Sequence, residues 1–187
     1  IEPYVSIRAN PMTDSICVEG MRRASRSLCR AYHHGRDPEA RTDMSLASLL
    51  GGVALANAGL GVVHGFAAPI GGMFLAAHGA VCAALLPHGM DVNIRALRAR
   101  ALESESLRRY EAVARILTGD QSARAEDGVN WVSQVCQELE IPPLSSYGID
   151  EQDVPLLVEK ASRASSTKGN PITLTAEELR EVLTRAL

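Results

Sequence analysis

Hydrophobic residues recur every three or four positions along most of the chain, and this spacing is typical of amphipathic helices. One such stripe lies near the N-terminus, two lie in the middle and one ends the chain: Ile16, Met21, Ala24 and Leu28; Leu107, Tyr110, Val113 and Leu117; Val132, Val135, Cys136 and Leu139; Leu179, Val182, Leu183 and Leu187. Strict alternation of polar and apolar residues, which would indicate strands, is not found. The pattern therefore predicts roughly six to nine helices and an all-α fold.

Helix start signals agree with this pattern. Asn10 precedes Pro11 and Asp37 precedes Pro38, in each case a capping residue followed by a proline that tolerates the first helical position. Thr175 is followed three residues later by Glu178, which predicts a capping box at the last helix. A further helix is expected over residues 150–164, followed by a polar loop over residues 165–171.

Residues 44–90 contain no Asp, Glu, Lys or Arg. A transmembrane hairpin would explain this, because about 20 apolar residues span a bilayer. However, the segment contains many glycines, two prolines and three histidines, and its uninterrupted apolar runs are short. Such residues are costly in lipid, so we expect a layer of helices buried within protein and no membrane contact.

Composition narrows the classes of function. Nineteen Lys and Arg against 22 Asp and Glu give a net charge of -3, which argues against a nucleic-acid partner. Four cysteines without a CxxC pair predict reduced, mostly buried thiols in a cytoplasmic protein. The N-terminal residues Ile1-Glu2-Pro3-Tyr4 do not resemble a signal peptide, and we expect the chain to be a piece of a longer one.

Gly59, Gly61 and Gly65 superficially suggest a dinucleotide-binding loop. In the GxGxxG pattern the third glycine would fall at His64, and the preceding residues 48–58 predict a helix where that motif needs a strand. We therefore assign no nucleotide-binding residue to this chain.

His64 and His78 are the two histidines that most strongly suggest a site, because an imidazole in an uncharged segment needs a partner. On one straight helix their 14-residue separation would be about 21 Å, too far for one metal ion. We expect the residues 69–72 (Pro-Ile-Gly-Gly) to break the helix and let the two rings converge. The alternative is that both are ordinary core histidines whose ring nitrogens are hydrogen-bonded within the protein. For His33 and His34 we expect helix capping or solvent exposure, and for His88 a hydrogen-bonded core or helix-end position.

A longer sequence pattern around His64 and His78 supports the hypothesis that they bind a metal ion. The run NAGLGVVHG at residues 57–65 continues through PIGG at 69–72 and HG at 78–79 to LLPH at 85–88. It closely resembles the iron-binding signature of the iron-containing (group III) alcohol dehydrogenases. Residues 2–14, with Glu2, Tyr4 and Asn10-Pro11, and Asn170-Pro171 near the end extend the resemblance over nearly the whole chain.

The resemblance implies a single all-helical, multi-helix domain over residues 1–187, the C-terminal domain of the dehydroquinate-synthase-like or iron alcohol dehydrogenase fold. It implies Fe(II), or alternatively Zn(II), with His64 and His78 as two of four ligands. An Asp-x-x-x-His pair would precede Ile1, and an N-terminal α/β domain outside this chain would bind NAD(P). Many members carry a histidine where this chain has Ala68, so the role of that residue cannot be transferred. We assign no catalytic residue.

The implied function is reversible hydride transfer between an alcohol or aldehyde substrate and NAD(P), with the metal as a Lewis acid. We expect the chain to be inactive and to bind iron weakly without the N-terminal half, and to form a homo-oligomer such as a dimer. Two alternatives remain open: a maleylacetate-reductase-like relative that reduces without metal, and a non-catalytic helical binding or scaffold module. The small residues Gly61, Gly65, Ala67 and Ala68 either leave room for substrate or allow close helix packing.

Overall fold

A computed structural model describes all of residues 1–187, and it contains only helices and connecting loops. The predicted all-α fold is therefore confirmed. The α-helices are α1 (Glu2–Val5), α2 (Pro11–His33), α3 (Pro38–Ala58), α4 (Val62–Met73), α5 (His78–Arg100), α6 (Glu105–Thr118), α7 (Ala125–Glu138), α8 (Val154–Arg163) and α9 (Ala176–Thr184). Two short 3-10 helices, η1 (Leu144–Tyr147) and η2 (Thr167–Gly169), lie in the C-terminal part.

The predicted helix starts are confirmed at three positions. The side chain of Asn10 accepts backbone hydrogen bonds at the start of α2, and Asp37 does the same at α3. Thr175 and Glu178 form the capping box of α9. Each cap satisfies N–H groups that have no partner within the helix, so these short polar signals fix where the helices begin.

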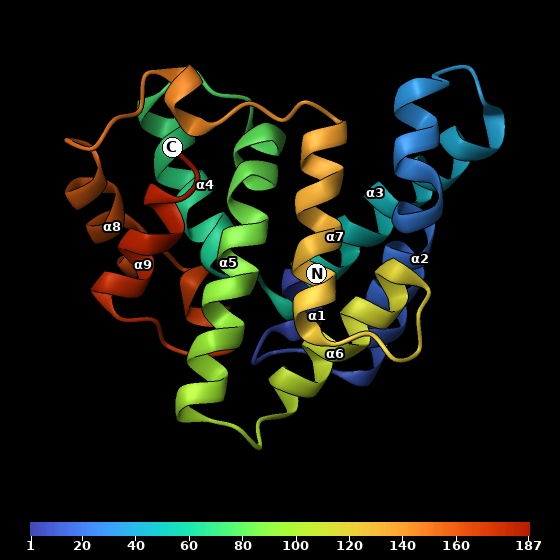
Figure 1. The fold of residues 1–187 in the computed structure, drawn as a ribbon, viewed down its shortest axis with the longest axis horizontal. Coiled ribbons are helices and arrows are strands. Elements are labelled where there is room, and N and C mark those ends of the chain that lie inside the picture. Colours follow the sequence, from blue (N-terminus) through green and yellow to red (C-terminus); the bar gives the residue numbers. More distant parts are fainter.

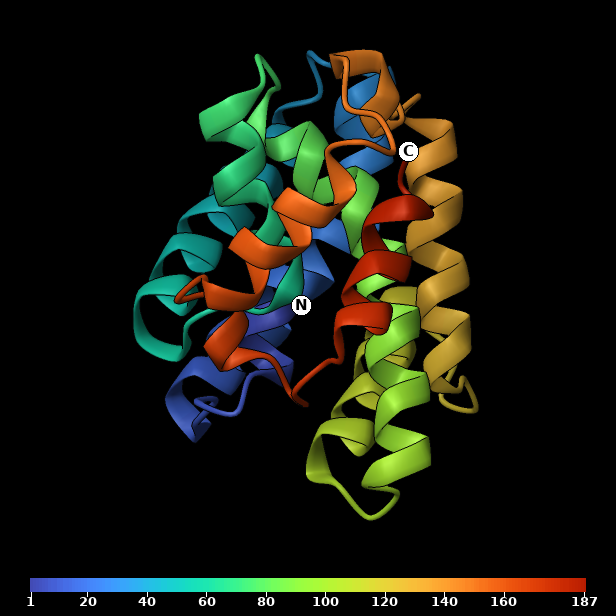
Figure 2. The ribbon, with the colours of Figure 1, turned by 90° about the vertical axis from the view of Figure 1, so that its left-hand side faces the viewer.

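Helix α5 stands between two hydrophobic cores. One face of α5, including Val81, Leu85 and Val92, packs with α4, α8 and α9, while Met90 and Ile94 pack with α1, α2, α6 and α7. Figure 1 shows this division, with α4, α8 and α9 on one side of α5 and the pair α2 and α3 on the other. In the orthogonal view α9 lies alongside α5 (Figure 2).

The uncharged segment is only partly a core, which corrects the sequence interpretation. Helix α4 and the first half of α5 are mainly buried, but most of α3 is not: Leu49 is 62% exposed, and Val53 and Leu55 are also exposed. The absence of charge in α3 therefore does not result from burial within this chain. No single helix is long and apolar enough to cross a membrane; α3 and α4, bent by 102° at their junction, pass a test of length and composition only as a pair.

The break between His64 and His78 lies further along the chain than predicted. Pro69 is inside α4, and the helix continues through Gly71 and Gly72 until Met73. The chain turns at residues 74–77, where Phe74 closes the helix by donating its N–H to the carbonyl of Ile70. A proline removes one helical hydrogen bond, and here the neighbouring bonds and the buried side chains of α4 outweigh that loss.

The segment at residues 165–171 also differs from the polar loop that the sequence predicted. It contains η2, and both Gly169 and Asn170 are buried. Gly169 accepts a hydrogen bond from the N–H of Ile7, and a β-carbon at Gly169 would lie 2.3 Å from the carbonyl oxygen of Leu60. The segment therefore packs between the N-terminal residues and the start of α4, where it contributes to the site.

Candidate metal centre

The starts of α4 and α5 bring His64 and His78 together. His64 is the third residue of α4 and His78 is the first of α5, and the turn at residues 74–77 folds the second helix back beside the first. The two imidazole ring centroids are 5.4 Å apart. His64 is half-buried and His78 is exposed, so the pair lies at the edge of the protein where a ligand can reach it.

Glu2 determines how the ring of His64 is oriented. Its carboxylate oxygen Oε2 lies 2.6 Å from Nδ1 of His64, and Oε1 accepts the backbone N–H of Val63 at 2.8 Å. A carboxylate at a helix N-terminus also interacts favourably with the helix dipole. With Nδ1 donating to Glu2, the lone pair of Nε2 is free to bind a metal, an arrangement common around metal-bound histidines.

Asn170 supports the same helix end. Its Oδ1 accepts the N–H of Val62 at 3.1 Å, and its amide exchanges hydrogen bonds with Asn93, which also contacts the hydroxyl of Tyr110. Tyr110 is fully buried, and this burial raises the pKa of its phenol. The N-cap residue of α4, Gly61, has no side chain that could accept the first N–H groups of the helix. Glu2 and Asn170, which are far away in the sequence, accept them instead.

The glycines before and after His64 allow close packing. A β-carbon at Gly61 would lie 2.7 Å from both Glu2 Oε1 and Asn170 Oδ1, and one at Gly65 would lie 2.0 Å from Thr167 Oγ1. These contacts favour the packing explanation over the alternative of space for substrate at both positions. Ala67 is buried, whereas Ala68 is exposed.

Cys82 is the site residue that sequence reasoning missed. It lies one turn after His78 on α5, and its Sγ is 3.6 Å from Nε2 of His78 and 3.8 Å from Nε2 of His64. Donor atoms from His64, His78 and Cys82 all lie within 4.8 Å of one another. The four-residue spacing of His78 and Cys82 could have indicated this position, because residues four apart on a helix share a face.

The electrostatic environment favours a positive charge at His64. Burial opposes protonation of its ring, but hydrogen bonds with Cys82 and Glu2 outweigh this effect and raise the pKa of His64 to about 10. A metal ion would supply the positive charge in place of the proton. Two imidazoles and a thiol are donors that Zn(II), Co(II) and Fe(II) all accept, so the residues present fit a divalent transition metal.

The other three histidines lie outside this cluster. His33 is exposed and pairs with Glu138 at 2.9 Å, and His34 is exposed, as expected. His88 lies within α5, which continues through Pro87, and its Nδ1 is buried without a hydrogen-bond partner. The expectation of a hydrogen-bonded core or helix-end histidine was therefore wrong, and burial lowers the pKa of His88.

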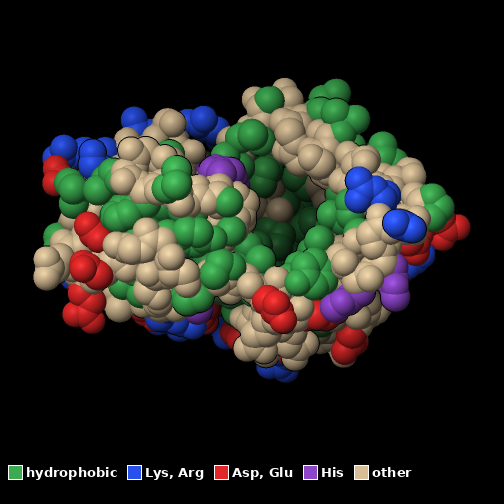
Figure 3. All heavy atoms as spheres, turned by 90° about the horizontal axis from the view of Figure 1, so that it is seen from above, with side chains coloured by type: hydrophobic (Ala, Val, Ile, Leu, Met, Phe, Trp, Pro, Cys, Tyr) green, Lys and Arg blue, Asp and Glu red, His purple; other side chains and the backbone are tan.

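A cavity of about 590 Å³ lies beside the cluster, and His64 and Cys82 form part of its wall. Most of its lining residues are hydrophobic and come from α2, α3, α5 and α7, including Met21, Leu50 and Val135. Figure 3 shows a deep hollow in this region, lined mainly by hydrophobic side chains. The cluster can thus present a metal ion at the border between a polar edge and an apolar space.

Comparison with known proteins identifies the family of the chain. The chain matches the model of the Fe-containing alcohol dehydrogenase family, C-terminal, over residues 1–187. It is 36% identical to alcohol dehydrogenase 4 of Schizosaccharomyces pombe, covering 100% of this chain and 43% of that protein. It is 30% identical to an NAD-dependent methanol dehydrogenase of Bacillus methanolicus, covering 100% of this chain and 48% of that protein.

A solved structure shows the same helical arrangement. The crystal structure of a 1,3-propanediol oxidoreductase superimposes with a TM-score of 0.89 at 30% identity, over 100% of this chain and 48% of that one. The chain thus spans about half the length of the relatives it matches. The family match and the shared helical fold lead to one conclusion: the chain belongs to the iron-containing alcohol dehydrogenase family of oxidoreductases, as the counterpart of their C-terminal helical domain.

Proposed function

We propose that this chain is the metal-binding part of an NAD(P)-linked alcohol dehydrogenase, with His64 and His78 as metal ligands. The observation that carries the proposal is the convergence of their rings at 5.4 Å, with Glu2 orienting one of them. In the reaction, the alcohol carbon gives a hydride to the nicotinamide and the hydroxyl gives a proton to solvent, which yields a carbonyl and NAD(P)H. The metal, Fe(II) or Zn(II), supplies Lewis acidity when bound.

The residues of this chain would hold the metal ion, orient its histidine ligand and surround the substrate. Glu2 keeps the proton of His64 on Nδ1, so that Nε2 faces the ion. The caps from Glu2 and Asn170 fix the first turn of α4, because both side chains bind its backbone N–H groups. The apolar cavity beside His64 would exclude water from the hydrocarbon part of a small alcohol or aldehyde.

The remaining machinery would come from a preceding N-terminal half. We assign to it the NAD(P)-binding domain and the Asp-x-x-x-His pair, because the matched relatives are about twice as long as this chain. Exposed apolar side chains on α3, such as Leu49 and Val53, provide a surface for such a half or for a second subunit. We place the assembled enzyme in the cytoplasm, as a homo-oligomer.

The test uses the complete protein that the gene encodes. We expect oxidation of primary alcohols with NAD⁺ or NADP⁺, loss of activity on chelation, and recovery with Fe(II) or Zn(II). His64→Ala and His78→Ala should each lower metal affinity by more than about tenfold. His34→Ala, at an exposed histidine directly after α2, should change nothing. Full activity of metal-free protein would contradict the proposal and favour a metal-independent reductase.

A further inference from the structure

Cys82 lies at a distance from both histidines that suits a shared metal ion. We propose that its thiolate is a third metal ligand, and that the site consequently prefers Zn(II) to Fe(II). The inference rests on the proposed metal-binding role of His64 and His78. It adds a donor and a metal preference to that role.

The geometry fits without a large movement. With Zn–S near 2.3 Å and Zn–N near 2.0–2.1 Å, tetrahedral bond angles place a sulfur and a nitrogen ligand about 3.6 Å apart. The two observed separations between Cys82 Sγ and an imidazole Nε2 are 3.6 Å and 3.8 Å. The same separations also suit S–H···N hydrogen bonds, so the three side chains can share either a proton or a metal ion without rearrangement of the helices.

Secondary structure holds the three donors in place. His78 and Cys82 are four residues apart on α5, so their side chains leave the same face of one helix. His64 reaches the same point from α4, with its ring fixed by Glu2. Cys82 is half-buried and lines the apolar cavity, so an ion bound there would contact both the helix edge and the cavity.

The chemistry of sulfur gives the metal preference. A thiolate is a soft ligand that favours Zn(II) over Fe(II) more than an imidazole or a carboxylate does. On binding, the thiol of Cys82 gives its proton to solvent and forms a metal–sulfur bond, with no change of oxidation state. This chain would then supply three protein donors, and the Asp-x-x-x-His pair assigned to the N-terminal half would supply the others.

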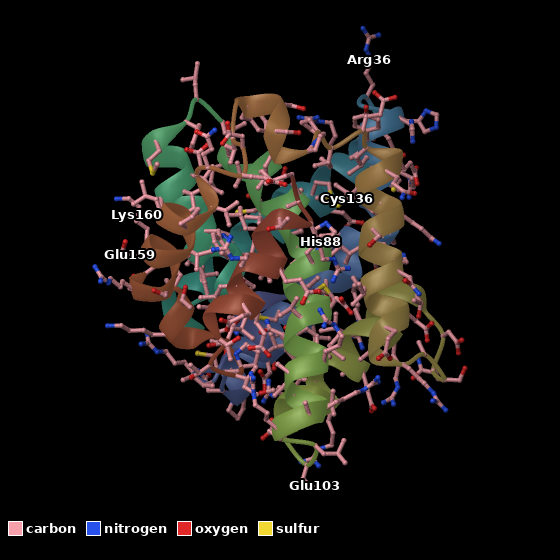
Figure 4. All side chains as sticks on the ribbon, turned by 60° about the vertical axis from the view of Figure 1, so that its left-hand side comes forward. Arg36, His88, Glu103, Cys136, Glu159 and Lys160 are labelled. Atoms are coloured by element: carbon pink, nitrogen blue, oxygen red, sulfur yellow. The ribbon has the colours of Figure 1, made fainter.

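The test uses Co(II) as a spectroscopic substitute for Zn(II) in the protein as its gene encodes it. We expect Co(II) to produce a near-ultraviolet thiolate-to-cobalt charge-transfer band in the wild type. Cys82→Ser should lose this band and bind Zn(II) at least about tenfold more weakly in chelator competition. Cys136→Ser is the matched control, because Cys136 lines the same cavity from α7 and donates to the carbonyl of Ala83 (Figure 4); it should keep both properties.

A second measurement requires no substitution. Zn(II) should protect Cys82 of the wild type from alkylation, as read by mass spectrometry. It should leave unchanged the labelling of Cys29, a partly buried free cysteine on α2. Equal labelling of Cys82 with and without Zn(II), or bound Co(II) without a thiolate band, would overturn Cys82 as a ligand while leaving the histidine site intact. Absence of any bound Co(II) would overturn the proposed metal function as well.

Discussion

The carboxylate of Glu2 lies 2.6 Å from Nδ1 of His64, although 62 residues separate the two along the chain. The same carboxylate accepts the N–H of Val63, so one buried side chain holds both the ring of His64 and the helix that carries it. Orientation of the candidate ligand is thus coupled to the capping of α4. This coupling can be tested separately from metal binding by His64 itself.

We expect Glu2→Gln to weaken metal binding by about 10–100-fold, the range found when the hydrogen-bond partner of a metal-bound histidine is changed. An amide can still accept the N–H of Val63, but it holds the imidazole less strongly than a charged carboxylate does. Chelator competition with Zn(II) measures the affinity. Glu103→Gln is the control, since Glu103 lies in the exposed loop after α5 (Figure 4). Equal affinities in the two variants would show that Glu2 does not position the ligand.

Gly65→Ala should destabilise the protein by about 1–3 kcal/mol, because the new β-carbon would lie 2.0 Å from Thr167 Oγ1. Chemical denaturation measures the change in the free energy of unfolding. Thr167→Ala removes the colliding oxygen, so Gly65→Ala should cost less in the Thr167→Ala background.

Gly72→Ala is the matched control on the same helix. Nothing lies within 4 Å of a β-carbon at Gly72, and alanine is the better helix former by roughly 0.5–1 kcal/mol. The two substitutions should therefore have opposite signs. A stabilising effect of both would mean that Thr167 adapts easily and that glycine is not required at position 65.

Local signals in the sequence predicted the helices and two of the three residues of the candidate cluster, His64 and His78. Asn10, Asp37 and Thr175 satisfy N–H groups within three residues of themselves, so each helix start could be predicted from adjacent residues. His64 and His78 were found through the resemblance and through their lack of charged neighbours. Both types of inference depend on residues close together in the chain.

The remaining features depend on tertiary contacts. Glu2 and Asn170 cap a helix that begins about 60 and 108 residues away from them, and no local pattern indicates such a pairing. The exposure of α3 was missed because an apolar helix has the same composition whether its own chain or another segment covers it. The continuation of α4 through Pro69 could not be predicted, because the packing that stabilises the helix around this proline comes from α5 and α8.

Acid should weaken the contact between α2 and α3 through Asp43. Its carboxylate accepts hydrogen bonds from Arg26 and Ser27 and pairs with Arg23, and these interactions, with Arg26 foremost, hold the pKa of Asp43 well below its usual value. A lowered folded-state pKa stabilises the fold above the unfolded-state pKa of about 3.9, and this contribution is lost as the pH falls toward the folded-state value.

Asp43→Asn should therefore be less stable than the wild type at pH 7, and the difference should narrow as the pH falls below about 4. Urea denaturation at several pH values measures it. Asp150→Asn, at an exposed turn, provides the comparison, and it should show a smaller difference at neutral pH. A difference between Asp43→Asn and the wild type that stays constant down to low pH would show that the charge of Asp43 does not contribute.

Asn170→Ala should be among the more damaging polar substitutions. It removes the acceptor for the N–H of Val62 and both hydrogen bonds with Asn93, and so leaves buried polar groups without partners. Each buried polar group that loses its partner costs about 1–3 kcal/mol, and Asn93 and the first turn of α4 would both be affected.

Asn57→Ala is the control, because the exposed Asn57 side chain bonds only to the carbonyl of Val53 in its own helix. Chemical denaturation should show a large decrease in the free energy of unfolding for Asn170→Ala. The change for Asn57→Ala should stay within about 0.5 kcal/mol. Since α4 carries His64, metal affinity should fall together with stability in Asn170→Ala; unchanged affinity would mean that Glu2 alone maintains the position of that histidine.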